Sequence, residues 1–199
     1  MSTTSIDLLR HGLPKGADCF RGHSDFALTE EGMAQMFAAM QHAPVAERLV
    51  SSPLRRCRDF AEQYAQQHQL ELLQAKQFME IDFGDWDGLP KQQVWEREQQ
   101  VLSAFWADPW HVTPPGGESL LAYEQRIVSA WKALLKQHRG KRVLLVTHGG
   151  VIKQILRYVL QLPRTASYLQ RLEIGYAARI SISVFHDSDG QLWPQVSFT

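Results

Sequence analysis

The sequence has little cysteine, no excess of charge of either sign and no long hydrophobic run. Its 199 residues include only two cysteines, Cys19 and Cys57, and their separation fits neither a metal-binding pair nor a Cys-x-x-Cys motif. No disulfide framework is needed, so we expect a reduced, cytoplasmic compartment. No stretch of about 18 apolar residues occurs, and residues 1–5 lack the positive charge of a signal peptide, so no membrane association is expected.

Basic and acidic residues are equally frequent, with 21 of each. A chain without net charge sets up no overall field that would attract nucleic acid or an anionic membrane, and neither is expected as a partner. Any anionic ligand must therefore be held by a few local cationic groups.

Hydrophobic periodicity predicts alternating strands and helices. Short apolar strands are expected at residues 6–9, 49–50 and 143–146, each followed by a helical pattern. The last of these strands is apolar at every position, which is typical of a central parallel strand covered on both faces. Residues 179–185 and 193–198 flank a turn and predict an antiparallel hairpin. We expect an α/β protein, a three-layer α/β/α sandwich whose mostly parallel sheet has an antiparallel edge strand.

Capping residues mark the starts of two predicted helices. Thr29 precedes Glu30 and Glu31, and Ser119 precedes a long amphipathic pattern. Before Ser119 the pattern is irregular, with glycines and prolines at both ends and one helical stretch at about 94–106. We expect a single domain over residues 1–199, in which residues of about 78–118 form an insertion or lid over one edge of the sheet.

Polar residues follow three of the predicted strands, as Arg10-His11, Ser51-Ser52 and Thr147-His148. Ligands of parallel sheets bind beyond the carboxyl ends of the strands. These three segments, although distant in sequence, are therefore expected at one rim.

Four segments carry a resemblance to a known family. They are the Arg-His-Gly at 10–12, residues 51–56 before a helix, residues 80–88, and the Thr-His-Gly-Gly at 147–150. In this order they resemble the histidine phosphatase superfamily, also called the phosphoglycerate mutase-like family, over nearly the whole chain. The resemblance implies a phosphoglycerate mutase-like fold and a phosphoric monoester hydrolase that works through phosphohistidine. Neither a metal nor another cofactor is expected.

The resemblance also implies roles for single residues. His11 matches the nucleophile, and a neutral imidazole is suited to accepting a phosphoryl group near pH 7. Arg10 and Arg56 match the arginines that bind phosphate through their forked donors. His148 matches a second histidine, expected to donate to the phosphate as a cation. Backbone N–H groups at Gly149, where a helix starts, also favour an anion.

Glu80 matches the acid that protonates the leaving alkoxide. A bound phosphate dianion and apolar neighbours are expected to favour its protonated form. Asp82 and Asp85 are alternatives for this role. Arg21 lies in a family-like segment near the site entrance, where it either contacts substrate or is only a loop residue. Arg58 is expected on a solvated helix face, with a contribution to the electrostatics of the rim as the alternative.

The segment after Arg-His-Gly distinguishes two branches of the family. The mutases carry an acidic residue, a serine and an asparagine there, and residues 13–18 lack them, so water is the expected phosphoryl acceptor. Residues 8–14, 20–22 and 32–36 resemble α-ribazole phosphatases, which implies α-ribazole 5′-phosphate as substrate, in cobalamin nucleotide-loop assembly. A broad-specificity or sugar-phosphate phosphatase, a phosphoglycerate mutase-like enzyme and a non-enzymatic phospho-ligand binding module are the alternatives.

The expected partner is a small-molecule phosphomonoester, and a homodimer is one option for the assembly. Four tryptophans in or beside the insertion either stack on a flat heterocyclic leaving group or pack the insertion on the sheet. They are Trp86, Trp95, Trp106 and Trp110.

Overall fold

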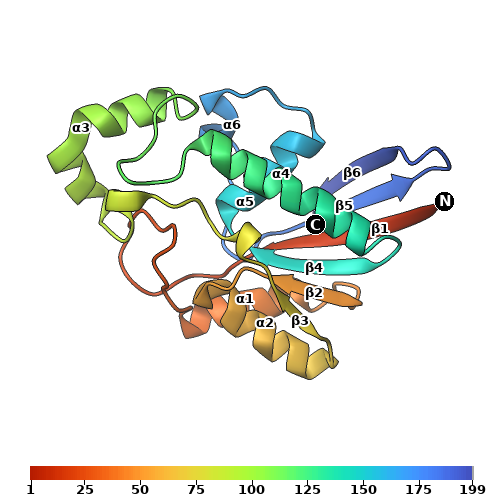
Figure 1. The fold of residues 1–199 in the computed structure, drawn as a ribbon. Helices are drawn as coiled ribbons and strands as arrows, with labels where there is room; N and C mark the ends of the chain where they lie inside the picture. The colour runs from red at the N-terminus through yellow and green to blue at the C-terminus, as the bar shows by residue number, and fades with distance from the viewer. Residues whose placement is uncertain (199) are drawn as a thin grey trace.

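The computed structural model describes residues 1–198 and places a six-stranded sheet between two layers of helices (Figure 1). The strands are β1 (Ser2–Arg10), β2 (Arg48–Ser51), β3 (Leu72–Gln74), β4 (Arg142–Thr147), β5 (Arg179–His186) and β6 (Leu192–Phe198). Their order is β3-β2-β4-β1-β5-β6, with β1 to β4 parallel and β5 and β6 antiparallel. The expected α/β fold with an antiparallel edge is confirmed.

Helices cover both faces of this sheet. They are α1 (Glu30–Met40), α2 (Arg55–His68), α3 (Lys91–Ala107), α4 (Leu120–Gln137), α5 (Gly149–Val159) and α6 (Ala166–Arg171), with 3₁₀ turns at Lys76–Phe78 and Gly84–Trp86. Helices α1 and α2 pack on one face, and α4 and α5 pack on the other. Within residues 1–198, no helix combines the length and the hydrophobicity needed to cross a bilayer.

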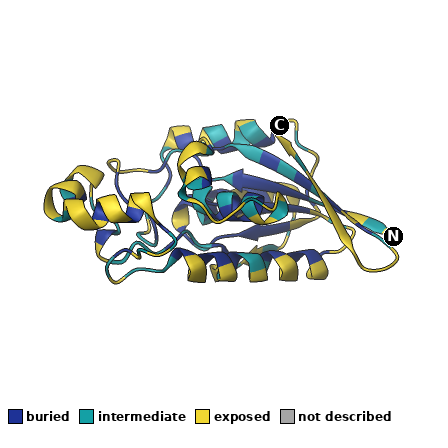
Figure 2. Ribbon diagram, turned by 90° about the horizontal axis from the view of Figure 1, so that it is seen from above, coloured by how far each residue is buried: buried dark blue, intermediate teal, exposed yellow. Residues whose placement is uncertain are grey.

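Strand β4 is buried on both faces, which explains its apolar side chain at every position. Val143 and Leu145 pack with residues of α4 and α5, whereas Leu144 and Val146 pack with residues of α1 and α2. Figure 2 shows the central strands buried and the outward faces of the helices exposed. The strand therefore fixes the two helical layers relative to each other.

Both predicted helix caps are present. The Thr29 hydroxyl accepts a hydrogen bond from Gly32 N (2.9 Å), and the Ser119 hydroxyl accepts one from Ala122 N (3.2 Å). Sequence patterns missed β3 and α6, which are too short to show a period, and the polar start of β1. Residues 2–5 of β1 are extended because they pair with residues 183–186 of β5.

Residues 78–118 contain the second 3₁₀ turn and α3, and they form a small core together with Phe20. That core contains Phe20, Trp86, Val94, Leu102 and Phe105. In Figure 1, α3 projects beyond the carboxyl ends of the parallel strands. The segment therefore lies at the rim where the motif residues meet, and not over a sheet edge as the sequence led us to expect.

Candidate active site

The strand register brings the motif residues together. Arg10 at the end of β1 pairs with Thr147 at the end of β4, so His11 and His148 leave the sheet side by side. Their ring centroids are 5.3 Å apart, and both residues are buried. The second strand adds Ser52, whose hydroxyl is 2.8 Å from His148 Nε2.

His11 is held in one tautomer. Its Nδ1 lies 2.8 Å from the carbonyl oxygen of Gly12, and because a carbonyl only accepts, Nδ1 must carry the proton. The lone pair is then on Nε2. Burial, with a further contribution from the charge of Arg56, lowers the pKa of His11 well below its usual value of 6.5. The imidazole is therefore neutral and nucleophilic at neutral pH.

Close packing, and not a tight turn, requires glycine next to His11. A Cβ at Gly12 would lie 2.0 Å from the carbonyl oxygen of Gly32 in α1, and a Cβ at Gly32 would lie 2.2 Å from that of Leu13. Gly12 is not among the glycines with positive φ. Two facing glycines therefore let α1 approach the loop that carries His11.

Arg56 is fully buried and joins three parts of the site. Its Nη1 and Nη2 donate to the carbonyl oxygens of Ser24 (2.9 Å) and Gly22 (2.6 Å), and its Nε donates to His148 Nδ1 (3.2 Å). Since a guanidinium only donates, His148 Nδ1 accepts and its Nε2 carries the proton. The guanidinium thus fixes the orientation of the second histidine.

The surroundings of His148 favour a neutral ring, which differs from the positive charge expected from the sequence. Burial, followed by the charges of Arg56 and His11, lowers the pKa of His148 well below 6.5. The sequence led us to expect a cation, but these surroundings favour the neutral ring with a single Nε2–H donor. A phosphate dianion would act in the opposite direction, because a nearby negative charge favours the protonated form.

Arg10 lies across from these groups, with one donor unused. Its Nη1 donates to the carbonyl of Ile174, and its guanidinium carbon is 4.2 Å from the ring centroid of Tyr176. Its Nε is buried without a hydrogen-bond partner. Leaving a buried donor unpaired is costly, and a phosphate oxygen would satisfy it. A Cβ at Gly149 would lie 3.3 Å from this nitrogen, so glycine at this position avoids crowding the guanidinium.

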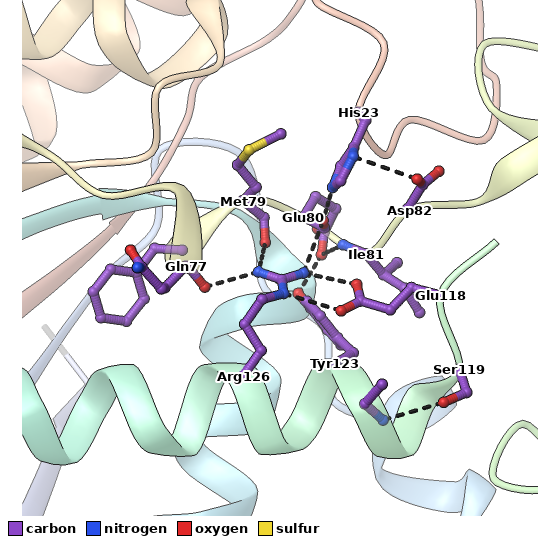
Figure 3. A network of polar contacts seen from close by, with 12 residues as sticks. His23, Gln77, Met79, Glu80, Ile81, Asp82, Glu118, Ser119, Tyr123 and Arg126 are labelled. Carbon is purple, nitrogen blue, oxygen red and sulfur yellow. Dashed lines mark hydrogen bonds and ion pairs between the residues drawn. The ribbon is translucent and has the colours of Figure 1, made fainter.

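Three donors meet the carboxylate of Glu80, and Figure 3 shows two of the donor residues, Tyr123 and Ile81. Oε1 accepts from the Tyr123 hydroxyl (2.5 Å) and from Ile81 N (3.1 Å), and Oε2 accepts from Gly150 N (3.0 Å). Hydrogen bonds to a carboxylate favour its ionised form. The surroundings of Glu80 are therefore more polar than its apolar sequence neighbours suggested.

Arg21 and Asp82, two further candidates from the sequence, make their contacts within the surrounding loops. The guanidinium of Arg21 turns toward its own loop, where Nη2 donates to Ala17 O (2.8 Å), although its charge helps to lower the pKa of His11 after burial and Arg56. Asp82 accepts a hydrogen bond from Gly84 N (2.8 Å), as a turn residue does. Its carboxylate also lies 3.5 Å from His23 Nδ1, again within the loop region.

Asp87 was not singled out from the sequence, yet it supports the site. Its carboxylate accepts from the backbone N–H groups of Gly22 (3.3 Å), His23 (2.5 Å) and Ser24 (3.0 Å). The carbonyls of the same loop hold Arg56. The only hint in the sequence was an acidic residue within the Trp-Asp-Gly element. Tyr123 and Tyr176 were missed in the same way.

A cavity of about 380 Å³ opens beside Glu80. Its lining includes Arg10, Glu80, Gly149 and Gly150 from the motif segments. Further lining residues are Phe83, Phe105, Trp106, Leu169 and Ile174, together with the charged Lys91, Lys153 and Glu173. The cavity therefore extends from the motif residues Arg10 and Glu80 to side chains of α3.

Of the four tryptophans, Trp106 is the one that lines this cavity. Trp86 is fully buried, and its Nε1 donates to Glu98 Oε2 (2.9 Å). Trp110 donates to Thr165 O (3.3 Å), and Trp95 is exposed on α3 without lining the cavity. Of these four tryptophans, Trp106 is therefore the one placed to stack on a ligand in the cavity.

The lowered pKa of His11 has a measurable consequence. A depressed pKa means that the ring is protonated only at lower pH, so the nucleophile should stay active as the pH falls through 6.5. We expect the acid limb of kcat/KM that reports His11 to lie well below pH 6.5. A profile from about pH 8 to about pH 4, with the histidine ring signals followed by NMR, checks this. An acid limb at or above 6.5 contradicts it.

The chain matches a known protein family over most of its length. The family model of the histidine phosphatase superfamily (branch 1) matches residues 6–193. A bifunctional protein of Mycobacterium tuberculosis is 34% identical over 194 residues, which cover 94% of this chain and 51% of that protein. The chain therefore spans about half the length of the first curated relatives that it matches.

Two further matches are phosphatases. The adenosylcobalamin/α-ribazole phosphatase of Escherichia coli is 25% identical over 181 residues, covering 88% of this chain and 89% of that protein. The structure of a mycobacterial glucosyl-3-phosphoglycerate phosphatase superposes with a TM-score of 0.84 at 25% identity, over 98% of both chains. Both proteins are named as phosphatases, which is the enzyme class that the motifs predict for this chain. The chain belongs to the histidine phosphatase superfamily, branch 1.

Proposed function

We propose that this chain hydrolyses small phosphomonoesters through a covalent phosphohistidine at His11. The observation that carries the proposal is the fixed tautomer of His11, which places a free lone pair on Nε2 in a buried site between two arginines. A group that only bound phosphate would have no need of an unprotonated nitrogen. The carboxyl group of Glu80, which lines the same cavity as Arg10, supplies a proton donor.

The first step transfers the phosphoryl group to the protein. His11 Nε2 attacks phosphorus, the bond from phosphorus to the ester oxygen breaks, and its electron pair stays on that oxygen. The resulting alkoxide takes a proton from Glu80 and leaves as the alcohol. Negative charge on the equatorial oxygens is stabilised by Arg10, by Arg56 and by the Nε2–H of His148, which a phosphate oxygen would take over from the Ser52 hydroxyl.

The second step returns the enzyme to its starting state. Water attacks phosphorus, the bond from phosphorus to Nε2 breaks, and the electron pair returns to His11. The carboxylate of Glu80 accepts the proton that water loses. Inorganic phosphate then leaves, and no redox change or second substrate alcohol is involved.

The proposed substrate is α-ribazole 5′-phosphate, in cobalamin nucleotide-loop assembly. The similarity to the E. coli phosphatase supports it, and Trp106 provides the indole ring of the cavity wall, on which a flat heterocycle can stack. A sugar-phosphate phosphatase is the second candidate. It is favoured by the mycobacterial structure and by Lys153, whose ammonium lines the cavity and has Leu169 O as its acceptor within the described residues.

A comparison of kcat/KM distinguishes these substrates. The assays would use α-ribazole 5′-phosphate, nucleotides, sugar phosphates and phosphoglycerates. The highest value is expected for α-ribazole 5′-phosphate. A preference for sugar phosphates would move the assignment to the second candidate, and a preference for phosphoglycerates would contradict both the substrate and the branch.

Two tryptophans of α3 offer a matched test of the cavity wall. Trp106 and Trp95 have similar exposed fractions, 41% and 43%, but Trp106 alone lines the cavity. Because stacking of a base on an aromatic ring contributes about 1–3 kcal/mol, Trp106→Ala should raise KM for α-ribazole 5′-phosphate about tenfold. Trp95→Ala should leave it unchanged. An equal rise in KM for the two variants would contradict stacking. An equal rise in KM for sugar phosphates in Trp106→Ala would contradict it as well.

A further inference from the structure

Helix α4 forms a second layer of contacts behind Glu80 (Figure 3). Tyr123 and Arg126 lie three residues apart and so share one face of this helix. The buried Tyr123 donates its hydroxyl to Glu80 Oε1 at 2.5 Å. Arg126 binds the backbone just before the carboxylate, because its Nη1 donates to the carbonyls of Gln77 (2.8 Å) and Met79 (3.1 Å). One helix face thus contacts both the side chain and the main chain of this segment.

The backbone of Glu80 is held from two sides. Arg126 Nη2 is 3.4 Å from Glu80 O, and His23 Nε2, from a different loop, is 3.0 Å from the same oxygen. Arg126 is itself fixed by Glu118, whose two carboxylate oxygens accept from Nε (3.0 Å) and Nη2 (2.7 Å). With the backbone fixed in this way, the remaining freedom of Glu80 is rotation of its side chain. The Tyr123 hydroxyl and Gly150 N restrict that rotation.

Tyr123 keeps its own proton. Burial, followed by the nearby charge of Glu80, raises the pKa of this phenol well above its usual value of 10. The hydroxyl therefore remains a neutral donor throughout the pH range of the enzyme, and the proton that moves in the reaction belongs to Glu80.

We propose that Tyr123 is a positioning residue for Glu80. Its hydroxyl holds Oε1 and thereby presents Oε2, which lies beside Gly150 at the cavity, to the ester oxygen and later to water. Its donated hydrogen bond also favours the carboxylate that accepts the proton of water in the second step. The inference rests on the proposed role of Glu80 and deepens it.

The test compares Tyr123→Phe with wild type on an alkyl phosphate and on p-nitrophenyl phosphate. Loss of one hydrogen bond to the carboxylate should lower kcat for the alkyl ester about tenfold, with less effect on p-nitrophenyl phosphate, whose leaving group needs little protonation. The alkaline limb of the pH–rate profile should move to higher pH, because the protonated carboxyl group persists longer without this donor. Tyr64→Phe, at a buried tyrosine of α2 on the other face of the sheet, should match wild type.

The other charged groups near Glu80 stay the same in these variants, so a shifted limb reports the Tyr123 hydroxyl. They are Arg126 and Glu118 beside α4, Arg10 at the end of β1, Arg56 on α2, Lys153 on α5 and His23 in the loop. Replacing Tyr123 by 3-fluorotyrosine keeps its shape and strengthens the donor. This replacement should move the alkaline limb of the pH–rate profile to lower pH.

Glu80→Gln separates failure of this inference from failure of the proposed function. One outcome would leave the acid role of Glu80 in place but contradict the positioning role of Tyr123. In it, Glu80→Gln slows the alkyl ester far more than p-nitrophenyl phosphate, while both Tyr123 variants keep the alkaline limb of wild type. Equal slowing of both substrates by Glu80→Gln removes Glu80 from the acid role. A loss of melting temperature in Tyr123→Phe with no shift of the limb in either variant would mean that Tyr123 is only structural.

Discussion

Replacement of His11 by alanine should abolish the phosphoenzyme and lower kcat by about 10⁴- to 10⁶-fold, the range expected when a nucleophile is removed. The lone pair on Nε2 has no substitute within reach that is comparably aligned. His148 Nε2 carries a proton that is directed to Ser52, and His148 Nδ1 is occupied by Arg56. The residual rate would come from binding alone.

The measurement is trapping of the intermediate. Protein mixed with a ³²P-labelled phosphomonoester and quenched in base should retain label that is stable to base and released by acid. His138→Ala serves as the control, because His138 is also a buried histidine but lies at the far end of α4. No label in wild type, or equal label in His11→Ala, would rule out the covalent mechanism.

Replacement of Arg56 by alanine should cost both activity and stability. Its guanidinium donates to the backbone carbonyls of Gly22 and Ser24 and to His148 Nδ1, and each acceptor left unpaired costs about 1–3 kcal/mol. With three acceptors affected, we expect the free energy of unfolding to fall by at least about 3 kcal/mol. Activity should fall about 10²- to 10³-fold, because one cationic ligand of the phosphate is lost and His148 is no longer oriented.

Arg58→Ala is the matched control on the same helix. Arg58 is partly exposed and pairs with Asp59 (3.0 Å) and Glu62 (3.6 Å). Surface ion pairs of this kind contribute about 0–1 kcal/mol, so neither activity nor melting temperature should change much. Arg56→Lys should fall between the two, since the charge is kept and the fork is lost. The reverse ranking of Arg56 and Arg58 would show that the motif has been aligned wrongly.

The buried position of Arg56 also depends on a residue far away in the sequence. Asp87 holds the backbone of residues 22–24, and that backbone supplies two of the four hydrogen-bond acceptors of Arg56. The segment of residues 20–24 and the Trp-Asp-Gly element at 86–88 therefore support the same guanidinium. A substitution at Asp87 acts on the phosphate site through this loop.

The sequence by itself determined the sheet, the helix caps and the identity of the histidine and arginine motifs. These features depend on local patterns: apolar residues at every position of β4, a hydroxyl before α1 and α4, and polar residues at three strand ends. The parallel topology then implied that the strand ends meet. Local patterns cannot reveal β3 and α6, which exist only because neighbouring elements hold such short segments.

Tertiary structure alone decided which side chains support the motif residues. Tyr123 reaches Glu80 across 43 positions, and Arg56 reaches His148 across 92. Such pairs are fixed by the packing of α4, α2 and α5 on the sheet, and no periodicity records them. Packing likewise buried Trp86, left Trp95 in solvent and placed Trp106 in the cavity wall. Residue types and their order therefore indicate phosphoryl chemistry, whereas orientation, protonation and cavity shape come from long-range contacts between them.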